Sequence, residues 1–205
     1  MNEIRVVKLG GSLLDSSETP GRLANWLQHQ SPARTVIIVG GGELVEALRR
    51  LDRVFQLDQD DVHFAAIDLM TITAKLFHAK FPSWSFCTDE SLKRSSFRAE
   101  ISILDVAKWA RSKTGLQKSW SVSSDSIAAA VAEEINADEL VLLKSALPGP
   151  GESLGDILSS DYLDTDFINW ASGLNSLRFV DLRSSAYSQL RFDSPLQTVS
   201  ALDAA

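Results

Sequence analysis

Short apolar runs recur along this chain, and polar or amphipathic segments separate them. The apolar runs predict buried strands over residues 4–7, 35–39, 84–88, 101–104, 140–143 and 177–182. Helical spacing of apolar residues predicts helices over 23–27, 43–57, 62–80, 106–111, 125–136 and 164–171. The run Val36–Val39 does not alternate with polar residues, which is typical of a parallel strand covered on both faces. The pattern therefore predicts an α/β fold, a three-layer αβα sandwich with a central, mainly parallel sheet.

No repeat, low-complexity block or linker divides the chain, so we expect one domain over residues 1–205. The segments 112–121 and 89–98 read as polar connections, and the pattern assigns no element after Ser184. A chain of 205 residues is long enough to bury a core without covalent cross-links.

Composition excludes several classes of protein. The formal net charge is −7 and the sequence pI is about 5.0, which argues against binding to nucleic acid or an anionic membrane. The single cysteine, Cys87, excludes an internal disulfide and a cysteine-rich zinc site, and its apolar run predicts a core position. No signal sequence or membrane-spanning apolar run is present, so we expect a cytoplasmic protein.

Candidate chemistry begins where the first strand ends, at Lys8-Leu9-Gly10-Gly11-Ser12. Adjacent glycines let backbone N–H groups close around an anion, and a neighbouring lysine supplies a charge suited to phosphate. An ordinary strand-to-helix turn is the alternative interpretation. The second strand also runs into glycines, Gly40-Gly41-Gly42, and the strand over 140–143 ends on Lys144.

A further polar element, Ser123-Ser124-Asp125, is expected at the start of a helix. In doubly wound folds ligands bind beyond the carboxyl ends of the strands, so these elements would meet at one site. Two lysines, two glycine turns and an aspartate suit phosphoryl transfer, in which positioning and charge neutralisation do most of the catalysis. Lys8 and Lys144 would stabilise charge, and Asp125 would hold their ammonium groups or a metal. Each residue also has a structural alternative: Lys8 as a surface lysine, Lys144 as a strand-end lysine that reaches solvent, and Asp125 as a helix N-cap.

Other common sites are missing from the sequence. There is no P-loop run and no serine nucleophile elbow, and Val45 stands where a dinucleotide fingerprint needs its third glycine. His63 follows Asp58, Asp60 and Asp61, but three carboxylates before a helix are typical of a solvated capping run. We therefore expect no protein metal site there. Trp120 is interpreted as a core aromatic residue, with a wall of the acceptor site as the alternative.

Together the motifs resemble those of the amino acid kinase family. Residues 7–12 are similar to its K-[LFI]-G-G-S opening, and residues 36–42 to its second glycine motif. Residues 123–128 resemble its N-x-D-[ST]-x-A segment, and residues 140–144 the strand that follows. The motifs occur in the family's order over residues 5 to 145.

The resemblance implies a kinase with two substrates laid head to head over the strand ends, a phosphoryl acceptor in about residues 1–120 and ATP in about 121–205. Lys8 would bridge the phosphates, with ATP contacts from Gly10, Gly11 and Ser12 and a further contact from Lys144. The implied remaining roles are acceptor contacts from Gly40, Gly41 and Gly42, orientation of the lysines by Asp125, and Mg²⁺ accompanying ATP. The long apolar helix over 62–80 suggests a homodimer, as in the family.

The chain also departs from the family pattern. Ser123 replaces the usual asparagine, and no lysine follows Lys144. Either Lys144 supplies the late charge, or one of Arg178, Arg183 and Arg191 does, or the site is catalytically weakened. The short chain most resembles a compact branch that includes the (aminomethyl)furanmethanol phosphate kinase, which implies a phosphomonoester acceptor. Open alternatives are a carboxylate or uridylate kinase, a non-catalytic nucleotide- or anion-binding member, and an unrelated α/β binding protein.

Overall fold

The computed structural model describes residues 3–88, 92, 101–113, 118–120, 122–171 and 173–193. Of the polar segment expected over 89–98, only Leu92 is described, and half of the connection expected over 112–121 also lies outside the described residues.

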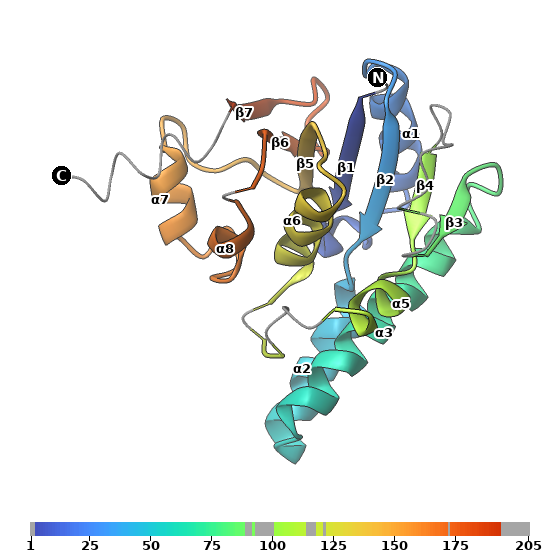
Figure 1. Cartoon of the computed structure of the whole chain (residues 1–205), viewed down its shortest axis with the longest axis vertical. Helices are drawn as coiled ribbons and strands as arrows, with labels where there is room; N and C mark the ends of the chain where they lie inside the picture. The colour runs from blue at the N-terminus through green and yellow to red at the C-terminus, as the bar shows by residue number, and fades with distance from the viewer. Residues whose placement is uncertain are drawn as a thin grey trace.

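A seven-stranded sheet forms the centre of the molecule, in the order β3-β4-β2-β1-β5-β6-β7 (Figure 1). Its strands are β1 (Ile4–Leu9), β2 (Arg34–Val39), β3 (Ser85–Cys87), β4 (Ile101–Leu104), β5 (Glu139–Lys144), β6 (Ser176–Asp181) and β7 (Gln189–Asp193). All neighbouring strands are parallel except β7, which runs antiparallel to β6. The predicted α/β class and mainly parallel sheet are therefore confirmed.

Helices cover both faces of this sheet. They are α1 (Thr19–Gln28), α2 (Gly42–Phe55), α3 (Gln59–His78), α5 (Val106–Arg111), α6 (Ser124–Glu134), α7 (Leu154–Ser159) and α8 (Phe167–Ala171). Successive side chains of a strand point to opposite faces, so Val6 packs in the cluster of α6 while Val7 packs with Leu23 and Trp26 of α1. The alanine-rich run of α6 is buried, which lets this helix lie close to the strands.

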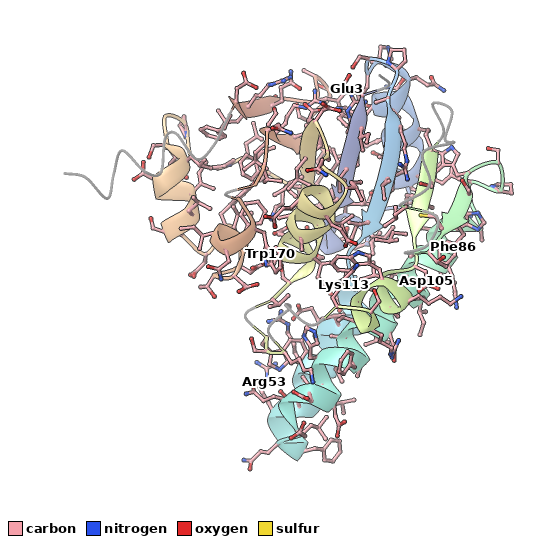
Figure 2. The ribbon with its side chains drawn as sticks, in the orientation of Figure 1. Glu3, Arg53, Phe86, Asp105, Lys113 and Trp170 are labelled. Carbon is pink, nitrogen blue, oxygen red and sulfur yellow. The ribbon has the colours of Figure 1, made fainter. Side chains whose placement is uncertain are left out.

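Helices α2 and α3 extend beyond the carboxyl ends of β1 and β2 (Figure 1). In Figure 2 Arg53 lies on this projection, at the opposite end of the molecule from Glu3 at the start of β1. No residue of α2 is buried, and Leu51 and Phe55 of its apolar stripe are exposed. Helix α2 therefore frames the space in front of the strand ends, while α3 also packs on the sheet through buried residues such as Ala74 and Phe77.

Some elements differ from the sequence expectation. The last helix begins at Phe167, not Asp164. Helix α7 was not expected, and it is a short helix stabilised by a capping box between Ser153 and Asp156. Strand β7 lies in the segment after Ser184 that the pattern left unassigned; it is a mostly exposed edge strand, so apolar periodicity gives little signal.

Two local expectations are confirmed. The carboxylate of Asp105 caps α5 by accepting from Lys108 N at 3.3 Å, and it also accepts from Thr71 Oγ1 at 3.1 Å (Figure 2). Cys87 is buried at the end of β3.

Candidate active site at the carboxyl ends of the strands

Two lysines from neighbouring strands meet on one aspartate. Lys8 lies on the same face of β1 as Val6, and this is the face that α6 covers. The register pairs Lys8 with Leu142. Lys144 lies two residues further along β5 and therefore points to the same face. Lys8 Nζ lies 2.8 Å from Asp125 Oδ1, and Lys144 Nζ lies 2.6 Å from Asp125 Oδ2. We call these three residues the ion triad.

The ion triad, of which Lys8 and Asp125 are buried and Lys144 is partly buried, carries a surplus of positive charge. Lys8 and Asp125 are each 5% exposed, and one carboxylate faces two ammonium groups. Burial opposes the charge of Asp125, but Lys8 and Lys144 hold the pKa of its carboxyl below the usual value. Burial, with repulsion from Lys8, lowers the pKa of Lys144 although Asp125 opposes this. A buried cluster with net positive charge is suited to an anionic ligand.

The structural alternatives for two of these residues do not hold. The N-cap of α6 is Ser123, whose hydroxyl accepts from Asp125 N at 3.1 Å, so the Asp125 carboxylate is available to the lysines. Lys144 does not extend into solvent, because its ammonium also donates to the carbonyl of Tyr162 at 3.1 Å.

The two glycine turns pack against each other, backbone to backbone. A β-carbon on Gly11 would lie 2.7 Å from Gly42 N, and one on Gly40 would lie 2.7 Å from Gly11 N. Gly42 also has a φ of +55°, which strains any other residue. Gly10 is tied to the next strand through its N–H, which donates to Leu143 O at 2.9 Å. The sequence predicted two separate turns, and the structure joins them into one surface.

This surface presents backbone donors. Gly11 and Ser12 open a short 3-10 helix and Gly42 opens α2, so their amides have no intrahelical acceptor. The hydroxyl of Ser12 donates to that of Ser145 at 3.2 Å, which links the first turn to the residue after Lys144.

A cavity of about 690 Å³ opens beside the glycine turns. Its walls near the ion triad include Gly11, Ser12, Gly42, Ser123 and Ser124. The ion triad itself lies behind this wall and does not line the cavity. A molecule of metabolite size in the cavity would therefore end at the glycine turns, next to the triad.

The part of the cavity between α2 and α3 has its own polar groups. The Arg49 guanidinium stacks on the Trp120 ring at 4.6 Å, and Trp120 Nε1 donates to Asp52 Oδ2 at 2.8 Å. Within the part of the chain that the structure describes, Nε of Arg49 has no hydrogen-bond partner, although Glu46 Oε1 lies 3.5 Å away. Burial lowers the pKa of His63, which therefore lines the cavity as a neutral imidazole. Trp120 is a half-buried cavity wall, not the core residue that the sequence suggested.

Only one of the three late arginines lies near the glycine turns. Arg183 Nη2 donates to Ser12 O at 2.8 Å and pairs with Asp15 Oδ1 at 2.9 Å. Arg178 and Arg191 instead contact Glu139, at the first residue of β5 and thus at the opposite end of the sheet.

The acidic run before α3 caps that helix. Asp58 Oδ1 accepts from Asp60 N at 2.9 Å and from Asp61 N at 3.4 Å. Within the described residues no group of three or more His, Cys, Asp or Glu side chains is arranged to hold a metal ion. Among the same residues, no helix is both long enough and apolar enough to cross a membrane.

Sequence reasoning missed the segment between α7 and α8 that contacts Lys144 of the ion triad. Tyr162 and Asp164 lie between α7 and α8, and they contact Lys144 and the start of α6. Asp164 is 38 residues from Ser126, its partner in α6, and no spacing rule connects residues so far apart. The sequence instead suggested Asp164 as the first residue of a helix.

Fold and geometry together define an α/β protein with a lysine- and glycine-rich candidate site at the carboxyl ends of parallel strands. A model of the amino acid kinase family matches residues 3–146. The chain belongs to the amino acid kinase family.

Named relatives agree with this assignment. The chain is 26% identical over 140 residues to the [5-(aminomethyl)furan-3-yl]methyl phosphate kinase of Methanocaldococcus jannaschii. The match covers 68% of this chain and 64% of the relative, so it spans less than two thirds of that protein.

Solved structures share the fold at low sequence identity. The UMP kinase of Ureaplasma parvum superposes with a TM-score of 0.65 at 12% identity, covering 87% of this chain and 89% of that one. The UMP kinase of Bacillus anthracis superposes with a TM-score of 0.63 at 13% identity, covering 90% and 89%. These likenesses concern the fold alone.

Proposed function

We propose that this protein is an ATP-dependent kinase that transfers the γ-phosphoryl group to a small acceptor, a phosphomonoester such as (aminomethyl)furanmethanol phosphate. The observation that carries the proposal is the buried ion triad of Lys8, Asp125 and Lys144 directly behind two packed glycine turns. The family assignment and the name of the M. jannaschii relative support the reaction class and the acceptor class.

Each part of the site has a role in this reaction. The phosphates of ATP would lie on the Gly10–Ser12 turn, where backbone amides and Lys8 neutralise their charge. Lys144 would stabilise the charge that spreads over the phosphoryl oxygens in the transition state, and Asp125 would orient both lysines. The acceptor would lie against Gly40–Gly42, with its body in the cavity. Residues of about 1–120 would then serve the acceptor and about 121–205 the nucleotide, within one domain.

Mg²⁺ would accompany ATP as its counter-ion. The Asp125 carboxylate is already engaged by two lysines, and the described residues contain no three-ligand metal group. The donor set fits an ion held mainly by phosphate oxygens and water, which is a common arrangement for Mg²⁺ bound with nucleotides. Its charge would add to that of the lysines in neutralising the phosphates.

A screen of ATP consumption tests the proposal. Phosphomonoesters, carboxylates, alcohols and uridylate would be supplied with Mg-ATP, and the phosphorylated product identified by mass spectrometry. We expect turnover with a phosphomonoester, and we expect Lys8→Ala to reduce it by about 10²- to 10³-fold. Phosphoryl transfer that survives Lys8→Ala contradicts the role assigned to Lys8. Turnover confined to carboxylates or alcohols contradicts the phosphomonoester class, and turnover confined to uridylate keeps that class but replaces the furan acceptor.

A second candidate is a nucleotide-binding protein of the same fold without catalysis. The observation that favours it is that no lysine follows Lys144 in the chain. Thermal stabilisation by Mg-ATP without turnover on any acceptor supports this second candidate.

We also propose a homodimer through α3. Its exposed apolar residues Ile72 and Leu76, with the half-buried Leu69, form one stripe of this helix. Light scattering at micromolar concentration should give twice the chain mass, and Ile72→Glu should give a monomer. A wild-type monomer contradicts this part of the proposal.

A further inference from the structure

The connection between α7 and α8 contacts Lys144 and two serines, Ser123 and Ser126, that lie on either side of Asp125 in the sequence. Figure 1 shows α8 lying beside α6, with α7 further from the sheet. We call residues 162–164, which belong to this connection, the strap. Its first residue, Tyr162, accepts from Lys144 Nζ through its carbonyl at 3.1 Å, and its ring centroid lies 4.8 Å from the same nitrogen. The Tyr162 hydroxyl donates to Ala146 O at 2.8 Å, just beyond β5.

The last residue of the strap holds the start of α6. Asp164 Oδ2 accepts from Ser123 Oγ at 2.5 Å, from Ser123 N at 3.2 Å and from Ser126 N at 3.1 Å. Asp164 Oδ1 accepts from the hydroxyl of Ser126. Asp125 lies between these two serines, so the backbone on either side of it is fixed by one carboxylate.

This arrangement does more than an ordinary helix cap requires. The Ser123 hydroxyl already caps α6 by accepting from Asp125 N. Asp164 adds a charged acceptor from a separate element, and charge-assisted hydrogen bonds of this kind are short and directional. Because the same strap also accepts a hydrogen bond from Lys144, it positions both partners of the 2.6 Å ion pair.

We propose that Asp164 is a positioning residue, which together with Tyr162 holds Asp125 and Lys144 in the positions that phosphoryl transfer requires. This inference rests on the proposed function for its effect on turnover. Its effect on the lysine itself does not depend on turnover.

The charges around Lys144 make the role measurable. Its ammonium faces Asp125 from α6, Lys8 from β1 and the strap with Tyr162 and Asp164. Asp181 of β6 is the register partner of Lys144. Burial and Lys8 lower the pKa of Lys144, while Asp125 and Asp164 raise it. Burial also raises the pKa of the Tyr162 phenol, so that group stays neutral while Lys144 titrates. Removing the charge of Asp164 should therefore lower the pKa of Lys144 further.

Asp164→Asn tests the proposal with two readouts. In the first, the rate at which acetic anhydride acylates Lys144 is followed by mass spectrometry across pH, because only the neutral amine reacts. We call the pH at which acylation reaches half of its maximal rate the Lys144 midpoint, and we expect it to be lower in the variant than in the parent. In the second, kcat for transfer from Mg-ATP to the phosphomonoester identified in the screen should fall about 10- to 100-fold, with its alkaline limb also at lower pH.

Asp156→Asn is the matched control. Asp156 is likewise a carboxylate bonded to a serine at a helix start, with Ser153 Oγ donating to it at 2.6 Å, but it is exposed and does not contact the ion triad. It should change neither the Lys144 midpoint nor kcat. If Asp164→Asn fails to fold, Ser126→Ala removes one hydroxyl donor to Asp164 and should produce a smaller kcat loss in the same direction.

The outcomes separate this inference from the proposed function. A shifted Lys144 midpoint in a protein that transfers no phosphoryl group supports the effect of the strap on Lys144 and rejects the kinase proposal, together with the role in transfer. An unchanged midpoint in Asp164→Asn, with kcat altered no more than in Asp156→Asn, overturns the positioning role.

Discussion

At the level of single residues, Arg183 is a candidate for the positive charge that no lysine after Lys144 supplies. Arg183 is the only one of the three late arginines that lies at this end of the sheet, where it holds the carbonyl of Ser12 at 2.8 Å. Its guanidinium is exposed, and its contacts with Ser12 O and Asp15 Oδ1 are both made through Nη2. Because these are exposed contacts, the guanidinium can exchange them for phosphate oxygens at little cost. We therefore expect Arg183 to contribute to nucleotide binding in place of the missing late lysine.

Arg183→Ala tests this role. Loss of a charged hydrogen bond to phosphate should lower kcat/KM for ATP by about tenfold or more, while the free energy of unfolding changes little. Arg191→Ala is the matched control, because Arg191 is similarly exposed and paired with Asp193 but lies at the opposite end of the sheet. Equal effects of the two substitutions on ATP kinetics refute a site-specific role.

Gly11 gives a second prediction at this scale. In Gly11→Ala the new methyl group would meet Gly42 N at 2.7 Å, and backbone cannot move aside cheaply. We expect a loss of about 1–3 kcal/mol in the free energy of unfolding. We also expect the rate of phosphoryl transfer to fall by more than this loss of stability accounts for.

Gly21→Ala controls for the change of residue type. A β-carbon on Gly21 has no neighbour within 4 Å, and the residue lies in α1, where alanine is the better helix former. This variant should be as stable as the parent or slightly more so by urea unfolding. If both variants lose stability equally, close contact between the glycine turns is not the cause.

The sequence identified the residues whose place follows from strand order. Lys8 and Lys144 could be expected at one site because parallel strands end at one edge of the sheet, and the structure brings both to Asp125. Tyr162 could not be anticipated, because it contacts Lys144 through a backbone carbonyl that carries no sequence signal. Residue-level chemistry was thus predictable on strands and not on connections.

At the level of elements, the same distinction holds. Strands β1, β2 and β5 are buried on both faces and each contains a run of adjacent apolar residues, which made their existence predictable. The short helix α7 and the edge strand β7 bury too little to produce a pattern. Their stability comes from a capping box and from pairing with β6, both of which depend on local or tertiary hydrogen bonds.

Charged side chains join four neighbouring strands at the amino end of the sheet, the end where Figure 2 places Glu3. Glu139 Oε2 of β5 lies 2.7 Å from Arg5 Nε of β1 and 2.8 Å from Arg178 Nη2 of β6. Arg191 of β7 lies 3.5 Å from the other oxygen of Glu139. This set holds the edge strand to the sheet.

Glu139→Gln should destabilise the protein strongly. Arg5 and Arg178 are 3% and 8% exposed. The variant removes the carboxylate that Arg178 contacts and leaves Arg5 with Glu3, at 3.2 Å, as its remaining ion partner. We expect a loss of about 3–5 kcal/mol in the free energy of unfolding, measured with urea. Asp193→Asn, on the exposed strand β7, should change it by less than about 1 kcal/mol. A comparable loss in both variants would mean that burial of the arginines does not set the effect.

At the level of the whole molecule, the ion triad couples folding to pH. The pKa of Asp125 is below its unfolded value of about 4, so its contribution to stability is present above that pH. It is lost as pH falls through the folded pKa. The pKa of Lys144 is also lowered, so between its folded value and about 10.4 the unfolded chain binds more protons. Stability should therefore rise with pH in that alkaline window.

Lys144→Met isolates both contributions, because it keeps an unbranched side chain and removes the charge. Without Lys144 the pKa of Asp125 loses one of its two lowering charges, so acid unfolding should begin at higher pH than in the parent. The alkaline rise should become flatter, since the group that causes it is gone. Urea unfolding from pH 3 to about 9.5, below tyrosine ionisation, measures both changes against the parent. If the free energy of unfolding varies with pH in the same way in both proteins, the ion triad does not link protonation to folding. The pKa shifts assigned to Asp125 and Lys144 would then be wrong.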